Sequence, residues 1–269
     1  MTTTVTQQPA VPTPPHGASG GGWAAPAVRI AGVSQIFERG TPPVLDRVDL
    51  DVAPGEFVCL VGASGCGKST LLNLMAGLLE PTSGEVEVSA RRPALMFQEP
   101  ALLPWLTAAG NVELALKARG VDRPRRREEA RRLLALVNLD GQGDKRVHEL
   151  SGGMRQRVAL ARSLAQDSSV LLMDEPFAAL DAITRDVLHV ELARVWAQQK
   201  LTVVFVTHNV REAARLGQRV VLMGSRPGRV VREWRIDLPQ PRTIESPEVS
   251  ALAAQITREL HQEISRHGN

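Results

Sequence analysis

Short apolar runs recur along the chain, and each is followed at once by polar residues or glycine. The clearest runs cover residues 56–61, 94–97, 170–173 and 201–206. Continuous apolar runs of this length are typical of strands that are buried on both faces of a sheet. We therefore expect a buried sheet, with polar side chains gathered where its strands end.

Other segments predict a small β-layer and several helices around this sheet. Strands are expected at 28–30, 44–52 and 85–88, with a turn at 40–43, and residues 101–165 indicate helices. Near the C-terminus, apolar residues fall at helical spacing from Val249 to Ile264, after Pro247 in the first turn. This last helix is expected to pack on the core, and a regulatory or partner-binding role is the alternative.

The residues between the first long apolar run and the next helix form a phosphate-loop motif. They fit the pattern G-x-x-x-x-G-K-[ST] and read Gly62, Ala63, Ser64, Gly65, Cys66, Gly67, Lys68, Ser69 and Thr70. The glycines allow backbone N–H groups to wrap a phosphate, and the following helix points its positive end at it. Lys68 would reach the β- and γ-phosphates, and the Ser69 hydroxyl can ligate Mg²⁺. The motif predicts a nucleoside triphosphate site.

Polar residues follow three of the other predicted strands. Asp174 and Glu175 come after the run 170–173, Gln98 after 94–97, and His208 after 201–206. Ligands bind at this edge of such sheets, so Asp174 is expected on the Mg²⁺ side and Glu175 beside a reacting water. Alone, Gln98 is equally an ordinary loop glutamine and His208 a structural histidine. The alternative for Asp174 and Glu175 is an ordinary surface turn. The phosphate loop earlier in the sequence makes this alternative the less favoured one.

A second glycine motif opens a later helix. It reads Leu150, Ser151, Gly152, Gly153, Met154, Arg155 and Gln156. Ser151 is suited to cap the helix, and the glycines expose backbone N–H groups to a second phosphate. One nucleotide does not need two such sites, whereas two chains facing head to tail would use both. Asp181 is expected to cap the next helix, and Asn209 with Glu212 forms a capping-box pattern further on.

Composition changes this picture little. Hydrophobic residues make up 43% of the chain, charged residues 23%, and the formal net charge is +3, which is ordinary for a globular protein and names no acidic partner. Every apolar run is shorter than the ~20 residues of a membrane-spanning helix, and the N-terminus lacks a signal-peptide pattern. Cys59 and Cys66 form no disulfide framework and are expected to be reduced, in the cytoplasm.

A cluster of basic residues lies between Lys117 and Arg132, where the sequence has eight Lys and Arg. A nucleic-acid patch is one interpretation, but Glu128 and Glu129 interrupt the cluster and aromatic residues are lacking there. A solvated helix face is the favoured interpretation, so no nucleic-acid partner is expected.

Together these motifs resemble the ATP-binding subunit of ABC transporters over about residues 28–240. The strings 99–107, 180–185 and 226–239 are similar to those of nitrate, alkanesulfonate and taurine importers, and importers of thiamine precursors, riboflavin and aromatic acids use similar ATPases. The resemblance implies an α/β fold: a P-loop NTPase (RecA-like) core with an antiparallel β subdomain and an inserted α-helical subdomain. The implied division is a disordered tail at 1–26, an ATPase domain at 27–240 with its helical subdomain at about 99–165, and a C-terminal helix at 241–269.

The resemblance also implies roles for single residues. Glu175 would be the general base, His208 would hold the γ-phosphate and the water, and Ser69, Gln98 and Asp174 would surround Mg²⁺. Besides the phosphate loop, the implied ATP-binding set is Phe37, Ser151, Gly152, Gly153, Gln156 and Asp181. Phe37 would stack on adenine in place of the usual Tyr, which this chain lacks; a core Phe is the alternative. Two copies would sandwich two ATP molecules, each between the phosphate loop of one chain and Ser151 of the other.

The implied function is ATP hydrolysis that powers solute import. The partners would be a second ATPase subunit, two transmembrane permease subunits and an extracytoplasmic solute-binding protein, at the cytoplasmic face of the inner membrane. Gln98 would couple the site to the permease surface at 100–107, where Trp105 is either a contact or a subdomain core residue. The alternative is a soluble ABC-type ATPase acting on nucleic acid or ribosomes. Such proteins carry two cassettes or a long insertion, whereas only 52 residues separate Gln98 from Ser151. The sequence does not specify the solute.

Overall fold

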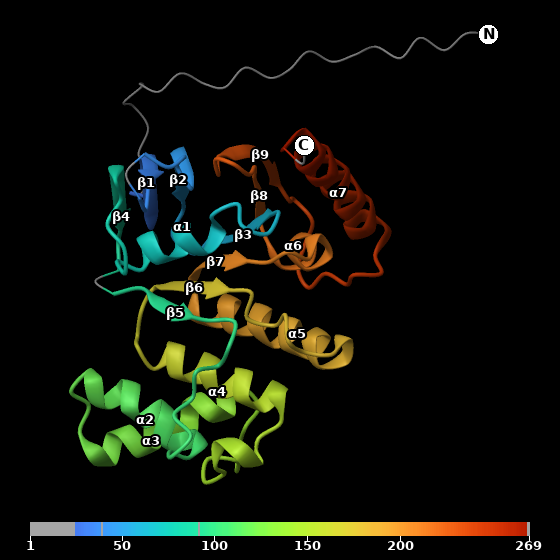
Figure 1. Ribbon diagram of the computed structural model, residues 1–269. Coiled ribbons are helices and arrows are strands. Elements are labelled where there is room, and N and C mark those ends of the chain that lie inside the picture. Colours follow the sequence, from blue (N-terminus) through green and yellow to red (C-terminus); the bar gives the residue numbers. More distant parts are fainter. Residues whose placement is uncertain (1–24, 39, 91, 268–269) are drawn as a thin grey trace.

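A computed structural model describes residues 25–38, 40–90 and 92–267. Almost all of the tail expected at 1–26 lies outside the described residues. Figure 1 shows a large central sheet, a smaller sheet beside it with α1 between the two, and a group of helices on the opposite side of the large sheet.

The central sheet carries the phosphate loop on its middle strands. Its order is β5-β6-β7-β3-β8-β9, and the strands are β3 (Phe57–Gly62), β5 (Ala94–Met96), β6 (Val170–Asp174), β7 (Thr202–Val206), β8 (Arg219–Met223) and β9 (Val230–Arg235). β3 pairs in parallel with β7 and β8, and every residue of these three strands is buried. A strand covered on both faces needs apolar residues throughout, which explains the continuous apolar runs of the sequence.

Strand β9 was not expected from the sequence. It pairs antiparallel with β8 at the edge of the sheet, and Trp234 is its only buried residue. Charged side chains on an edge strand hinder pairing with another chain. The same charges break the apolar run by which the other strands were recognised.

The smaller sheet is antiparallel, with the order β2-β1-β4. It consists of β1 (Val28–Gln35), β2 (Leu45–Val52) and β4 (Ser83–Val88). Its apolar residues share one buried cluster with helix α1 (Lys68–Met75) and with one face of the central sheet, for example Ile30, Leu71 and Val204. The small sheet therefore fixes the helix that follows the phosphate loop.

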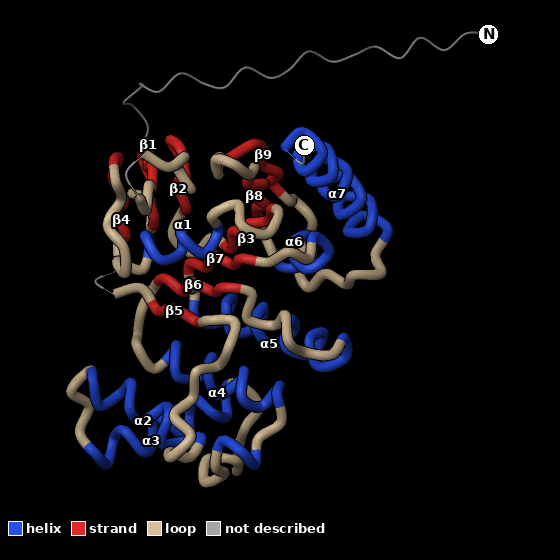
Figure 2. Tube along the Cα trace, in the orientation of Figure 1, coloured by secondary structure: helices blue, strands red, loops and turns tan. Residues whose placement is uncertain are grey.

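Four helices lie on the other side of the central sheet (Figure 2). They are α2 (Ala108–Ala118), α3 (Arg123–Leu136), α4 (Gly152–Leu164) and α5 (Ala182–Gln199), of which α2 and α3 pack on α4 and on each other, further from the strands. The expected helical stretch 101–165 is thus interrupted by loops at 101–107 and 137–151, apart from one short turn of helix at Val147–Glu149. Asn138 (φ 54°) and Gly141 (φ 69°) adopt left-handed backbone conformations, which a right-handed helix cannot include. In the first loop, the buried Asn111 side chain accepts from the Leu103 amide and donates to backbone carbonyls.

The C-terminal helix α7 (Pro247–His267) packs on α6 (Val210–Leu216). Val249, Ala253 and Ile256 are buried in this contact, whereas Ile264 near the end of the helix remains exposed. Across the described ranges, we find no helix with both the length and the apolar character that crossing a bilayer requires.

Candidate functional site

The phosphate loop runs from the end of β3 into the first turn of α1, and its lysine is folded into the loop. The Lys68 ammonium donates to the carbonyls of Gly62 and Ala63, both at 2.9 Å, and the residue is buried. Held this way, the positive charge lies where the backbone amides of the loop converge on an anion.

Two glycines let other segments press directly against this loop. At Gly67 (φ 93°), an added Cβ would lie 2.5 Å from the Leu45 Cδ2 atom at the start of β2. At Gly228, in the turn before β9, a Cβ would lie only 2.2 Å from the Cys66 carbonyl oxygen. The Gly228 amide also donates to the Val44 carbonyl at 2.9 Å. The loop is therefore held by segments far away in the sequence, and only glycine fits at these approaches.

Asp174 at the end of β6 lies beside the first hydroxyl of α1. The Ser69 hydroxyl hydrogen-bonds to its carboxylate, and burial raises the pKa of Asp174, with Glu175 adding to the rise and Lys68 opposing it. A divalent cation prefers such a carboxylate and hydroxyl as oxygen ligands. The donors therefore fit the predicted Mg²⁺ site. Gln98, the third expected ligand, follows β5 and is exposed.

Glu175 and His208 form a direct pair at the ends of neighbouring strands. The Nδ1 atom of His208 is 2.8 Å from Glu175 Oε2, and the His208 side chain is 65% exposed. Glu175 has a left-handed backbone (φ 44°), and its amide donates to the Val206 carbonyl at 3.0 Å. Such a conformation costs about 1–2 kcal/mol in a non-glycine residue. The backbone bond to the end of β7 opposes that cost and aims the carboxylate at His208.

The segment around Gln98 is clamped to helix α4 by side chains. Gln156 donates to the Gln98 carbonyl at 2.9 Å, and the Arg162 guanidinium donates to the carbonyls of Pro100 and Ala101, both at 2.7 Å. Burial lowers the pKa of Arg162. Gln156, an expected nucleotide ligand, is only 2% exposed within one chain, and its side chain faces the Gln98 segment. Its contact with nucleotide stays a prediction.

The second glycine motif opens α4, and Asp181 opens α5. The Ser151 hydroxyl accepts from the Met154 amide at 3.2 Å, and the Asp181 carboxylate accepts from the Thr184 amide at 2.9 Å. Both predicted caps are confirmed. The two motifs also touch, because a Cβ at Gly153 would lie 2.5 Å from Thr184 Cγ2.

Within one chain, the structure does not bring the glycine motif of α4 to the phosphate loop. Figure 1 shows α4 among the helices below the central sheet, whereas α1 and its loop lie above it. Ser151 and Gly152 are exposed. This separation fits the expectation that the two motifs meet only between two copies.

Phe37, the expected adenine platform, lies just after β1 and is 58% exposed. It is therefore not a core residue, and the alternative interpretation from the sequence is wrong. Arg162, Thr184 and Gly228 were not recognised from the sequence as parts of the site. Their contacts join segments far apart in the chain, and the only signals were the strings at 180–185, which includes Thr184, and at 226–239, which includes Gly228.

Comparisons with known proteins agree with this geometry. A family model described as ABC transporter matches residues 45–178. The chain is 47% identical over 209 residues to a taurine import ATP-binding protein of Mesorhizobium japonicum, covering 75% of this chain and 81% of the relative. It is 43% identical over 221 residues to a nitrate import ATP-binding protein of Synechocystis sp., covering 79% and 83%. For a bicarbonate transport ATP-binding protein of Synechococcus elongatus, the identity is 42% over 255 residues, covering 90% and 89%.

Solved structures show the same architecture. The chain is similar to the dimeric structure of a bacterial ABC transporter cassette, with a TM-score of 0.69 and 32% identity over 79% of this chain and 100% of that one. A dimeric ATP-binding cassette in a post-hydrolysis state, bound to ADP and Pi, gives a TM-score of 0.68 and 33% identity with the same coverage. These likenesses confirm the fold class that the sequence predicted.

Proposed function

Because the chain belongs to the family of ABC transporter ATP-binding proteins, we propose that it hydrolyses ATP to power solute import through a separate membrane permease. One observation carries the proposal. The Glu175–His208 pair stands at the same strand edge as the buried Lys68 and as Asp174 with Ser69. A carboxylate base, a cation for the phosphates and a set of oxygen ligands for a metal are thereby brought together.

In this proposal each residue acts on one part of the reaction. Lys68 and the loop amides bind the β- and γ-phosphates of ATP, and Phe37 stacks on the adenine. Glu175 takes a proton from the attacking water, and His208 orients that carboxylate and the γ-phosphate. Ser69, Asp174 and Gln98 would hold Mg²⁺, which supplies positive charge against the phosphate oxygens when bound.

The half of the site that contacts ATP from the other side comes from a second copy. Ser151 and Gly152 are exposed at the start of α4, and Gly153 is buried directly behind them; the amides of this first turn and the helix dipole attract phosphate. The similar cassettes are dimeric in their solved structures. A homodimer would place these residues of each copy, with Asp181, across the ATP of the other.

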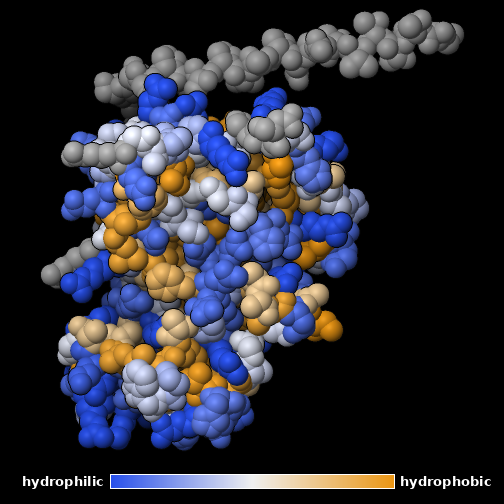
Figure 3. All heavy atoms as spheres, in the orientation of Figure 1, coloured by the Kyte–Doolittle hydropathy of each residue, from blue (hydrophilic) through white to orange (hydrophobic). Residues whose placement is uncertain are grey.

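The permease would dock on the helical part. Figure 3 shows hydrophobic surface gathered there among hydrophilic side chains. Trp105 and Leu114 are exposed apolar residues of this part, and Phe97, just before it in the sequence, is exposed as well. Trp105 is 66% exposed, so it is not a subdomain core residue. Contacts here would place the chain on the cytoplasmic face of the membrane, as a peripheral subunit beneath two permease subunits.

The solute is proposed by class. The relatives are named for taurine, nitrate and bicarbonate, which are small solutes carrying an oxyanion group. We propose that the permease and its extracytoplasmic binding protein handle a solute of this kind, a sulfonate or a small oxyanion.

The test is recovery of partners with an ATP-trapped variant. Tagged Glu175→Gln protein, which binds ATP without hydrolysing it, is isolated from its own cell membranes with ATP and Mg²⁺, and Lys68→Ala serves as the control that cannot bind ATP. A multi-span permease and an extracytoplasmic binding protein are expected with the first variant and depleted with the second. The binding protein can then be titrated with taurine, alkanesulfonates, nitrate and bicarbonate. Ribosomes or DNA without a membrane protein would refute the proposal.

A further inference from the structure

A buried polar chain lies directly behind the Glu175–His208 pair. The hydroxyl of Thr207, the residue before His208, donates to the Glu212 carboxylate on α6. The other oxygen of Glu212 is 2.5 Å from the Nε2 atom of His189 on α5. His189 is only 1% exposed, and Thr207 and Glu212 are buried as well.

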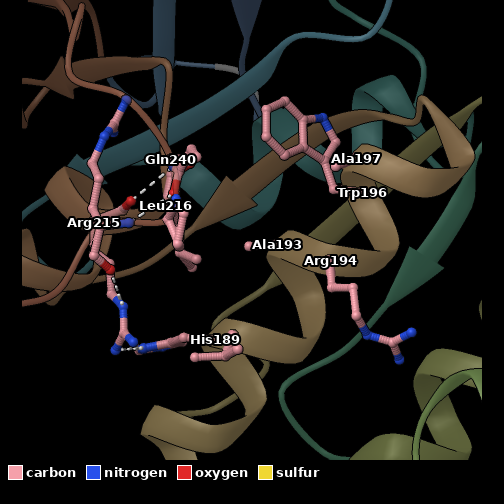
Figure 4. A pocket seen from close by; sticks show the side chains of 11 residues that line it. His189, Ala193, Arg194, Trp196, Ala197, Arg215, Leu216 and Gln240 are labelled. Carbon is pink, nitrogen blue, oxygen red and sulfur yellow. Dashed lines mark hydrogen bonds between the residues drawn. The ribbon is translucent and has the colours of Figure 1, made fainter.

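Arg215 decides which nitrogen of His189 carries the proton. Its Nη1 atom is 3.5 Å from His189 Nδ1 and also donates to Asp186. Figure 4 shows the Arg215 guanidinium reaching the His189 ring. A guanidinium only donates hydrogen bonds, so its place beside Nδ1 favours the tautomer in which Nε2 carries the hydrogen that goes to Glu212. The hydrogen bonds therefore run in one direction: Arg215 donates to His189, and His189 donates to Glu212.

The Glu212 side chain is held by these buried hydrogen bonds and does not cap its own helix. The capping-box pattern predicted that Glu212 would bond back to the Asn209 amide. That amide instead donates to the Thr207 hydroxyl at 2.9 Å, and both Glu212 oxygens accept from side chains. The capping-box prediction is wrong for Glu212, because a buried carboxylate is better satisfied by two side-chain donors than by one backbone amide.

The chain also contacts the Glu175 side of the site. The ring of Phe177, two residues after Glu175, packs against His189 with centroids 5.7 Å apart. A small cavity of about 20 Å³ is lined by Glu175 and His208 together with Thr207 and Glu212. The buried hydrogen-bonded residues and the Glu175–His208 pair therefore border the same cavity.

We propose that His189 and Glu212 are positioning residues for ATP hydrolysis: by fixing the Thr207 hydroxyl, they set the place of His208 against Glu175. The inference rests on the proposed function, in which His208 orients the reacting groups. Thr207 directly follows β7, where its amide donates to the Leu60 carbonyl at 3.1 Å, and His208 lies in the exposed turn after it. The Thr207–Glu212 bond fixes the side chain of Thr207 as well, at the last residue before His208. Misplacing a reacting group by about 1 Å can cost roughly 100-fold in rate.

If His189 and Glu212 served stability alone, the rate of hydrolysis would follow the melting temperature in every variant. Paired substitutions distinguish this structural role from the proposed positioning role. His189→Leu leaves a buried carboxylate with one partner, which should lower both stability and rate. Replacing both partners by apolar side chains removes that penalty, so His189→Leu combined with Glu212→Leu should restore most of the stability, with only the Thr207 hydroxyl left without its acceptor. A cavity of about 300 Å³ adjoins His189, lined also by Ala193, Trp196 and Leu216 (Figure 4), and it gives altered side chains room. His189→Gln can still donate to Glu212 and accept from Arg215.

The experiment compares kcat, the KM for ATP and the melting temperature for these variants, with the exposed His261→Leu as the matched control. We expect His189→Leu and the double variant both to lose kcat by roughly tenfold or more, with the KM for ATP within about twofold, because a small displacement of His208 is enough. The double variant should regain most of the lost melting temperature but not kcat, since Thr207 still lacks its acceptor. His189→Gln should retain most of kcat.

Recovery of kcat together with the melting temperature in the double variant would overturn the inference, as would His189→Gln being as slow as His189→Leu. Glu175→Gln in the same assay keeps the outcomes apart. If the wild-type chain hydrolyses no ATP, or Glu175→Gln is as fast as wild type, the proposed function fails. If Glu175→Gln is inactive while the His189 variants are fast, only the positioning inference fails.

Discussion

Gly153→Ala is expected to lower both the stability of the chain and its rate of ATP hydrolysis through one contact. That contact joins the glycine motif at the start of α4 to the start of α5 near Asp181, and both are expected to face a second copy. An alanine Cβ at 153 would lie 2.5 Å from Thr184 Cγ2, and the next atom, Thr184 Cβ, is 3.9 Å away. The methyl of Thr184 is therefore the only atom seriously in the way. It cannot rotate aside freely, because the Thr184 hydroxyl is hydrogen-bonded to the Asp181 carboxylate, which lowers the pKa of Asp181.

The magnitude follows from two opposing effects. Overpacking of this kind costs roughly 1–3 kcal/mol, and replacing a helical glycine by alanine returns about 0.5–1 kcal/mol. With mid-range values of about 2 and 0.75 kcal/mol, the net loss is roughly 1 kcal/mol, which should lower the melting temperature by roughly 2–4 °C in a domain of this size. Relief of the clash would push the start of α4 away from α5 and displace Ser151, so hydrolysis should fall by roughly tenfold or more.

Thr184→Ser supplies the matched rescue. Serine removes the methyl and keeps the hydroxyl bond to Asp181, so Gly153→Ala with Thr184→Ser should regain both melting temperature and rate. Thr184→Val keeps a methyl and loses the hydroxyl, so it should rescue neither. ATP hydrolysis is measured at saturating ATP over a range of protein concentrations, because Ser151 is expected to act on the ATP of another copy. A wild-type rate for Gly153→Ala alone, or no recovery with Thr184→Ser, would refute this reasoning.

Three further outcomes are expected. Gly228→Ala should weaken binding of a fluorescent ATP analogue by roughly tenfold or more, since a Cβ 2.2 Å from the Cys66 carbonyl must deform the phosphate loop; unchanged affinity would show that the loop does not depend on this turn. Burial, opposed by Arg157 and Arg194, raises the pKa of Glu191 from 4.5 to about 7, so the folded chain holds a proton that the unfolded chain releases. The free energy of unfolding should therefore fall by up to ~3 kcal/mol as pH rises from about 4.5 to above about 7. Denaturant titrations of Glu191→Gln should lack this pH dependence. Trp105→Ala should reduce permease recovery with the ATP-trapped variant by roughly tenfold, as losing an aromatic anchor does at other interfaces; full recovery would place the docking surface elsewhere.

Features that depend on neighbouring residues were predictable from the sequence. The phosphate loop, the buried strands and the caps at Ser151 and Asp181 each follow from a few consecutive residues, and the structure has them. The polar strand ends Asp174, Glu175 and His208 could be placed together because parallel strands end at one edge.

Features that depend on contacts between distant segments were not predictable. The sequence gives no sign that Arg162 would bond to Pro100, or that Glu212 would meet His189 rather than cap its helix. In both cases a buried polar group takes the partner that the tertiary fold supplies, and this choice overrides the local pattern. Strand β9 was missed for a different reason: charged residues interrupt its apolar positions, whereas β5 at the other edge of the sheet has a continuous apolar run.

The turn at Gly228 also bears on when the site can first exist. The phosphate loop is complete in sequence once Thr70 has been made, but Gly228, which presses on Cys66, follows Gly67 by 228 − 67 = 161 residues. The flanking strands β7 and β8 are likewise made late. At about 5–20 residues per second, a ribosome needs roughly 8–30 s to cover that distance. A growing chain therefore carries the motif long before it has the site, and ATP can assist the folding of this domain only near the end of its synthesis.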